Sequence, residues 1–398
     1  MNHRPSHSTF VGIALALATA ACAPASDLSW RNVQFGGFAS QGYLKSSAND
    51  YIGDSSDGTF DFREYAGNAS WSAGKWRIGA QAFAQKLGVY GKDKIKLDWA
   101  TVDYQAAQWL GFRIGRVKTP RGLYNEALDL DAVRPFVLLP QSVYDARLRD
   151  FNASFDGLMS YGNIGGGKFG SIDYKVFYGD IAVSSDSGAN DYFNGDKIMP
   201  NYAIGMDSVV GGSLFWNTPL QGLRVGYSFN QFKNLSTLRS TTGTAFDLHT
   251  KTAAKFPRTI YSAEYVAGNW TFASEYSRES GDYIVNYVNR VRTSYPKAKI
   301  TSYYLSSARR INRWLEVGGY YDSYEEINTL STGVQPPKKQ NDRALSLRFD
   351  LTEHVILKLE GHVLRGPGKI LDTAAHPQPY ASLTQKWTMI AGKATYVF

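Results

Sequence analysis

The sequence has almost no cysteine, few histidines and no long apolar run. Cys22 is the only cysteine, which excludes an intrachain disulfide and a multi-cysteine metal site. No stretch after the N-terminal region has the roughly 20 consecutive apolar residues that a transmembrane helix needs. The chain has six histidines in 398 residues. His362 shares a strand face with Glu360, but no serine is marked as their partner, so we predict no enzyme activity.

The N-terminus has the pattern of a secretory signal peptide. Arg4 precedes an apolar run over residues 10–21, and Ala23-Pro24-Ala25 fits an Ala-x-Ala cleavage site. The pattern predicts a signal peptide over residues 1–25 and an exported domain over 26–398. The alternative is a lipoprotein acylated on Cys22, but Thr19 stands three residues earlier, where leucine is usual.

The composition favours short amphipathic strands. Aromatic residues make up 14% of the chain, with 26 tyrosines and 38 glycines, and the mean hydropathy is −0.32. Such a chain can alternate apolar and polar side chains along strands that are joined by turns. The formal net charge of +8 weakly favours anionic partners.

The last eleven residues alternate between two faces. Thr388, Ile390 and Tyr396 lie on one face, and Met389 and Lys393 lie on the other. Strict alternation predicts a β-strand. A chain that stops on an exposed apolar strand would leave an unpaired edge. Pairing of this strand with the first strand would remove that edge and close a transmembrane β-barrel.

Alternating segments recur along the whole chain, and the connections between them alternate between short and long. Short turns and long outer loops in strict alternation are typical of an outer-membrane barrel. We therefore predict an all-β fold, a 16-stranded antiparallel transmembrane β-barrel. The predicted strands are 31–44, 61–73, 75–86, 95–106, 109–117, 153–163, 170–180, 208–217, 222–232, 258–267, 269–278, 299–309, 314–323, 342–351, 354–364 and 387–398.

The phase of each strand assigns its side chains to lipid or lumen. Apolar positions such as Leu110, Phe112 and Ile114 predict a lipid-facing side, and charged positions between them predict a wet lumen. Seven of nine tryptophans lie near predicted short turns, which is typical of an aromatic girdle. By phase we assign to the lumen a basic wall and a set of further charged residues. The basic wall is Arg77, Arg113, Arg224, Arg348 and Lys358, and the further residues are Asp103, Asp156, Asp173, Lys175, Glu275 and Glu316.

The third long connection, residues 118–152, is about 35 residues long, far beyond an ordinary connection. Leu138, Leu139 and its aromatic residues argue against disorder. We predict that this loop folds into the lumen as a constriction, with its acidic residues opposite the basic wall. The predicted pore-lining residues of this loop are Lys118, Arg121, Glu126, Asp129, Asp131 and Arg134.

With these features the chain resembles the Gram-negative porin family. The segment Lys118-Thr119-Pro120-Arg121-Gly122 is similar to the third-loop entry of substrate-preferring porins, including phosphate-selective ones. The resemblance implies a homotrimer, a third loop that forms the constriction, and recognition of Phe398 by the barrel-assembly machinery.

The predicted function is an outer-membrane porin, a water-filled channel for passive diffusion of small hydrophilic solutes, with anionic solutes as one option. Alternatives are an adhesin or a barrel hydrolase with a closed lumen. We expect no cofactor, no metal and no nucleic acid. Asp50, Asp54, Asp57 and Asp61 are interpreted as a solvated acidic loop rather than a Ca²⁺ site. Basic residues of the outer loops are expected to contact lipid or lipopolysaccharide: Lys251, Lys255, Arg258, Arg290, Arg292, Lys297 and Lys299.

Overall fold

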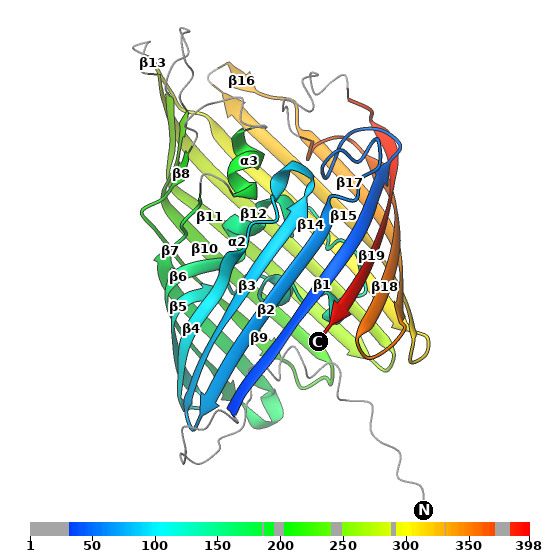
Figure 1. The fold of residues 1–398 in the computed structure, drawn as a ribbon. Coiled ribbons are helices and arrows are strands. Elements are labelled where there is room, and N and C mark those ends of the chain that lie inside the picture. The colour runs from blue at the N-terminus through cyan, green and yellow to red at the C-terminus, as the bar shows by residue number, and fades with distance from the viewer. Residues whose placement is uncertain are drawn as a thin grey trace, which may run out of the picture.

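A computed structural model describes residues 32–184, 187–194, 203–239, 249–287, 292–330, 332–370 and 383–398. These residues form one β-sheet that closes on itself as a barrel (Figure 1). The predicted signal peptide lies outside the described residues. No helix among the described residues is long and apolar enough to cross a membrane.

Sixteen antiparallel strands form the ring, which confirms the predicted fold class. Three further short strands, β8 (Ala203–Gly205), β13 (Arg292–Ser294) and β16 (Gly333–Val334), pair within long connections. The ring strands are β1 (Val33–Ser46), β2 (Phe62–Ala73), β3 (Trp76–Leu87), β4 (Lys96–Ala107), β5 (Leu110–Lys118), β6 (Ser154–Gly165), β7 (Ser171–Asp180), β9 (Ser208–Asn217), β10 (Leu223–Arg239), β11 (His249–Ala267), β12 (Trp270–Tyr287), β14 (Lys297–Arg310), β15 (Leu315–Leu330), β17 (Lys338–Asp350), β18 (Val355–Arg365) and β19 (Lys386–Val397).

The ring closes where the last strand meets the first, as the alternation at the C-terminus predicted. Strand β19 pairs antiparallel with β1, with Phe38 opposite Val397 and Ser46 opposite Met389. Beyond the strand, Gly37 and Phe398 exchange two backbone hydrogen bonds of 3.0 and 3.1 Å. The ring therefore has no unpaired edge, and every ring strand has two hydrogen-bonded neighbours.

Each predicted segment corresponds to one ring strand, and most ends agree within a few residues. The largest differences are in β10, β11, β12 and β15, where pairing continues to Arg239, His249, Tyr287 and Leu330. These extensions carry polar residues on both faces, so they lack the apolar alternation by which a strand is recognised in a sequence.

The two faces of the wall differ in chemistry, as the strand phase predicted. On β18, Lys358, Glu360 and His362 are buried, while Leu359 and Val363 on the alternate positions are about half exposed. The exposed face also carries tryptophans near the short connections: Trp76, Trp109, Trp216, Trp270 and Trp314. An exposed apolar face opposite a charged one is the arrangement of a barrel in a bilayer.

One phase assignment is wrong. Asp156 lies on the same face as the exposed Leu158 and Ile164, and it faces Arg116 at 3.8 Å. Asp156 is near the long-connection end of β6, where a side chain leaves the apolar band and reaches headgroups or water. A charge there carries little of the cost it would have at the bilayer midplane.

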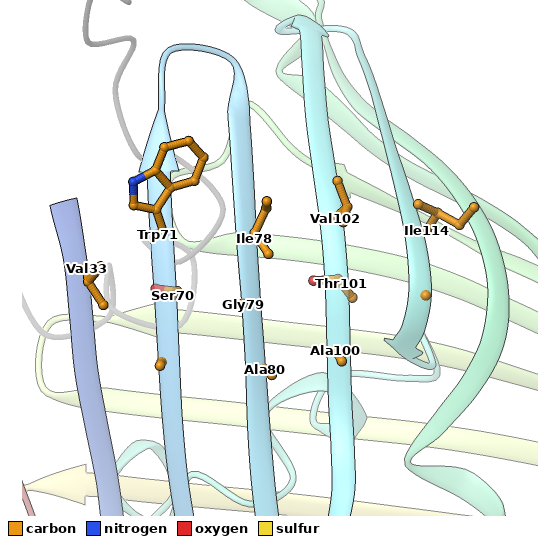
Figure 2. Close-up of a pocket in the computed structure, with 12 residues that line it drawn as sticks. Val33, Ser70, Trp71, Ile78, Gly79, Ala80, Ala100, Thr101, Val102 and Ile114 are labelled. Atoms are coloured by element: carbon orange, nitrogen blue, oxygen red, sulfur yellow. The ribbon is translucent and has the colours of Figure 1, made fainter. Parts of the chain in front are cut away.

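The exposed face is hollowed over β1 to β5. Figure 2 shows Trp71 and Ile78 at one end of this hollow, with the small residues Ala80 and Ala100 along its floor. The hollow has a volume of about 550 Å³. Elsewhere on this face large side chains stand out from the wall, for example Tyr178 at 64% exposure. We call this feature the outer hollow.

Candidate functional site

The charged face of the wall and residues 119–152, which follow β5, form the candidate site. Part of this connection is folded into short helical turns: η3 (Asn125–Ala127), η4 (Asp131–Val133), η5 (Ala146–Leu148) and α2 (Arg149–Asn152). We call residues 119–152 the third loop. Its contacts with the wall divide the charged side chains into two groups, those that remain partly exposed and those that are buried.

The first group lies on β3, β4 and β5. Asp103 of β4 is in register with Arg77 of β3 on one side and Arg113 of β5 on the other. The Arg113 Nε donates to the Asp103 carboxylate at 2.5 Å, and the Tyr161 hydroxyl donates to its other oxygen. The Arg113 side chain keeps 23% of its surface exposed. A cationic group is thus held in place by its partner while part of it still faces solvent.

Glu126 brings the third loop to this partly exposed group. Its carboxylate accepts a hydrogen bond from Lys175 of β7 at 2.5 Å, and 35% of its side chain is exposed. Burial by itself would raise the pKa of Glu126, but Lys175, then Arg113 and Arg224, outweigh burial and lower it. Arg224 of β10 lies 3.9 Å from Asp173. Glu126 therefore stays ionised among three basic side chains.

The second group begins with Asp129, which is buried in a four-membered ionic cluster. Lys118 lies 2.6 Å from Asp98 and 2.5 Å from Asp129, and Arg149 lies 2.7 and 2.6 Å from the same two carboxylates. Arg149 and Lys118 outweigh the effect of burial and hold the pKa of Asp129 far below its ordinary value. Two cations and two anions thus join both ends of the third loop to β4.

Asp131 makes a second buried cluster, with strands that lie beyond β1 from β4 in the ring. It lies 3.0 Å from Lys358 of β18 and 3.5 Å from Lys393 of β19, and Thr395 donates to its other oxygen at 2.7 Å. Burial would raise the pKa of Asp131, but Lys358, Lys393 and Arg134 lower it well below its ordinary value. Lys358 also donates to the carbonyl of Phe136 at 3.2 Å. Each of these ion pairs compensates a charge that would otherwise be buried alone.

Three wall carboxylates accept backbone N–H groups of the third loop. Glu275 of β12 accepts from Leu123 at 2.9 Å, and Asp322 of β15 accepts from Ser142 at 3.0 Å. Glu360 of β18 accepts from both Val137 and Leu138, at 3.0 and 3.1 Å. These bonds fix three separate points of the loop backbone to three strands. A hydrogen bond to a charged acceptor is worth roughly 1.5–3 kcal/mol.

Three arginines complete the attachment. Arg348 of β17 donates to the carbonyls of Ala132 and Arg134 at 2.6 and 3.1 Å. Arg121 of the loop and Arg258 of β11 share Glu279, at 3.5 and 3.3 Å. Arg258 is therefore buried in the wall, and its predicted position in an outer loop is wrong. The bulge that shifts the register of β11 against β12 lies between Ala253 and Arg258, so simple alternation fails there.

The eleven predicted pore-lining residues thus separate by exposure. Arg77, Arg113, Glu126 and Arg224 remain partly exposed. Lys118 keeps 11% of its side chain exposed, and the others are buried in contacts between loop and wall: Arg121, Asp129, Asp131, Arg134, Arg348 and Lys358. The acidic residues Asp129 and Asp131 are closely ion-paired rather than set across a gap from the basic wall. Sequence reasoning missed Asp98, Asp322 and Lys393 as wall partners of the loop, and Arg149 as the loop residue that binds Asp98. Alternation could have found Asp322 and Lys393, whereas Asp98 lies in a bulge of β4 against β3.

No cluster of three or more metal-type ligands occurs among the described residues. The buried His362 lies between Asp342 at 2.9 Å and Glu360 at 3.1 Å. In the described part of the chain no serine hydroxyl is bonded to its ring, so the arrangement of a serine hydrolase is not formed there.

Comparisons with known proteins support the fold strongly and say little at the level of sequence. No family model and no curated protein sequence matches the chain. The outer membrane channel DcaP of Acinetobacter baumannii superposes with a TM-score of 0.58 at 10% identity, over 94% of this chain and 100% of that one. The chain has the fold of the outer-membrane porins.

Two further porin structures give the same result. OmpF of Salmonella typhi, solved in complex with daunomycin, has a TM-score of 0.57 at 11% identity, over 92% of this chain and 97% of that chain. An anion-selective porin of Comamonas acidovorans has a TM-score of 0.52 at 13% identity, over 92% and 99%. OmpT of Vibrio cholerae, an outer-membrane protein, superposes similarly, with a TM-score of 0.56 at 10% identity over 92% and 97%. Structural similarity at identities this low establishes a shared fold and does not identify the solute.

Proposed function

We propose that this chain is an outer-membrane porin, a water-filled channel through which small hydrophilic solutes diffuse passively. The observation that carries the proposal is the closed 16-stranded ring with an exposed apolar face and a charged opposite face. A ring of this size encloses more space than wall side chains fill. Charged side chains in that space favour water over a packed apolar core.

The third loop narrows this channel. Its residues bond to β4, β12, β15, β17, β18 and β19, which lie on different parts of the ring. The loop bonds to side chains on the charged face of these strands. The shortest path for one segment that reaches all of them crosses the lumen. The buried ion pairs hold the loop, and the remaining opening lies beside β3 to β7 and β10.

Arg77, Arg113, Arg224 and Glu126 line the opening. They are the predicted pore residues that keep solvent exposure, and with Lys175, Asp103 and Asp173 they place both signs of charge along it. Such a field orders water and sorts solutes by charge and size. The basic side chains at the opening favour anionic solutes, and the negative charge of Glu126 weakens that preference.

The chain works in the bacterial outer membrane as a homotrimer. Residues 1–25 direct export, and the assembly machinery recognises the strand that ends at Phe398. The outer hollow supports the trimer, because small side chains over β1 to β5 let another copy approach closely. Filling the hollow through Ala80→Trp and Ala100→Trp should convert trimers to monomers in cross-linking. Trimers that persist unchanged would place the interface elsewhere.

Two other functions remain as alternatives, an adhesin that uses the outer loops and a barrel hydrolase, both with a closed lumen. The partly exposed charges beside β3 to β7 favour the channel over either. Purified protein in planar bilayers separates them. The channel predicts discrete conductance steps and entry of small sugars into proteoliposomes at a rate that falls with sugar size. Membranes that stay electrically silent at full protein incorporation would reject the channel.

A further inference from the structure

Glu126 is held differently from the next acidic residues of the third loop. Asp129 and Asp131 are buried, and each is ion-paired with at least two cations. Glu126 keeps 35% of its side chain exposed, and among the described residues its one ion pair is with Lys175 at 2.5 Å. Glu126 is therefore a loop carboxylate that a single contact holds at the opening.

The loop backbone beside Glu126 does not depend on that contact. Asn125 is buried, and its side-chain amide donates to the carbonyls of Thr119 and Asn152 at 2.9 Å each. The N–H of the residue after Glu126 donates to the Tyr124 carbonyl at 3.0 Å, which closes the short turn η3. The Glu126 side chain can thus change rotamer and leave Lys175 while these bonds keep the loop in place.

Lys175 depends on Glu126 for a negative partner. In the ladders of the wall it lies opposite Tyr161 of β6 and Ser213 of β9, which are both neutral. Asp173 is two residues away on the same strand face, but two asparagine side chains donate to its carboxylate at 2.6 and 2.8 Å. Within the described part of the chain, Glu126 is the only ion-pair partner of Lys175.

The arginines of the opening have wall carboxylates of their own. Arg113 is bonded to Asp103, and Arg224 is directly opposite Glu264 in the β10–β11 ladder. Neither pair involves the third loop. If Glu126 turned away, the opening would keep these pairs and gain one uncompensated positive charge on β7. A passing anion with a single negative charge would restore the balance.

We propose that Glu126 fills a subsite on Lys175 that small organic monocarboxylates occupy as they pass the opening. Glu126 and the solute exchange on the ammonium group, because both present the two oxygen atoms of a carboxylate. Arg113 and Arg224 support either occupant, since their charges already stabilise the ionised Glu126.

The exchange rests on the channel function proposed above and gives it a solute class. A solute must leave a channel as readily as it enters, so its binding has to be weak. Glu126 keeps the binding weak by competing for Lys175 from a fixed position on the third loop.

The test uses the full-length protein in detergent with acetate as the probe, and saturation-transfer NMR measures acetate binding without any need for conduction. Glu126→Gln removes the competitor and keeps the size of the side chain. If Glu126 fills the subsite about nine-tenths of the time, this variant should lower the apparent Kd for acetate about tenfold. Acetamide, which has the shape of acetate and no charge, should bind to neither protein.

Three further variants separate exchange from a general change in the electric field. Glu264→Gln also removes a wall carboxylate at the opening, and it should lower the apparent Kd less than about twofold, because its effect on Lys175 is indirect and screened. Glu126→Asp keeps the charge on a side chain that is one methylene too short for Lys175, so it should bind acetate more tightly than the unmodified chain. Lys175→Gln/Glu126→Gln should lose the gain of Glu126→Gln.

An unchanged apparent Kd in Glu126→Gln, with a folded barrel shown by heat-modifiable mobility, would overturn the proposal. A gain of the same size in Glu264→Gln, or a gain that survives in the double variant, would also overturn it, since net charge alone would then explain the result. Planar-bilayer recording keeps the two proposals apart. Silent membranes would reject the channel, whereas conductance steps together with an unchanged acetate Kd would keep the channel and reject the subsite.

Discussion

On the charged face of the wall, similar basic residues are buried on one side of the barrel and partly exposed on the other. On β17 to β19, Arg348, Lys358 and Lys393 are buried beneath the third loop, and each bonds to it. On β5 and β10, Arg113 and Arg224 keep about a quarter of their side chains exposed. We call these the anchored side and the open side. Similar basic residues thus bind the third loop on the anchored side and stay partly exposed on the open side.

Removing Asp131 should have the largest effect, because it is the shared partner of two buried lysines. Asp131→Asn leaves Lys358 without its carboxylate and Lys393 with Glu64 alone. Breaking a buried ion pair costs roughly 3–5 kcal/mol. We expect that loss in urea unfolding from lipid vesicles, together with larger or noisier conductance steps as the loop is released. Unchanged stability and unchanged steps would show that the anchored side does not hold the loop.

The pH dependence of the stability difference between the unmodified protein and Asp131→Asn tests the same ion pairs. The pKa of Asp131 in the folded protein is lowered well below its ordinary value by Lys358 and Lys393, which outweigh burial. A lowered pKa contributes stability that is fully present above the unfolded pKa, about 3.9. That stability is lost only as pH falls through the lower folded value. The gap in unfolding free energy between the unmodified protein and Asp131→Asn should therefore shrink as pH falls below about 4. A gap that closes near pH 6 would contradict the assignment.

A smaller effect is expected from Glu360, which holds the loop through two backbone N–H groups. Glu360→Ala should cost roughly 1–3 kcal/mol, because it leaves both donors buried and unpaired. Glu360→Gln keeps one acceptor oxygen and should lose less. Equal losses for the two variants would mean that the hydrogen bonds to Val137 and Leu138 are not the cause.

On the open side, substitutions should change ion selectivity more than stability. In Arg113→Gln/Arg224→Gln two partly exposed charges are removed, so we expect a loss of under about 2 kcal/mol. The permeability ratio of anions to cations should fall roughly two- to fivefold, the effect of about 1 kcal/mol at close range in water. Lys45→Gln, an exposed residue outside the lumen, serves as control in reversal-potential measurements.

The contrast between the anchored side and the open side also explains which features could be predicted from the sequence. Alternation reports which face a side chain occupies, so the sixteen strands, the closure at Phe398 and the charged face were predictable. Whether a charge on that face is covered depends on contacts between residues far apart in the chain, such as Leu138 with Glu360. Alternation also fails at bulges, which is why Asp98 was missed and Arg258 misplaced.

The most direct test of the channel compares one residue before and after chemical modification. Cys22 is the only cysteine and lies in the predicted signal peptide, so Arg113→Cys provides a single thiol on the open side. A negatively charged methanethiosulfonate reagent, added during single-channel recording, should lower the conductance step and reduce anion preference. An open channel that does not respond to the reagent would place Arg113 away from the path of the ions and contradict the proposed opening.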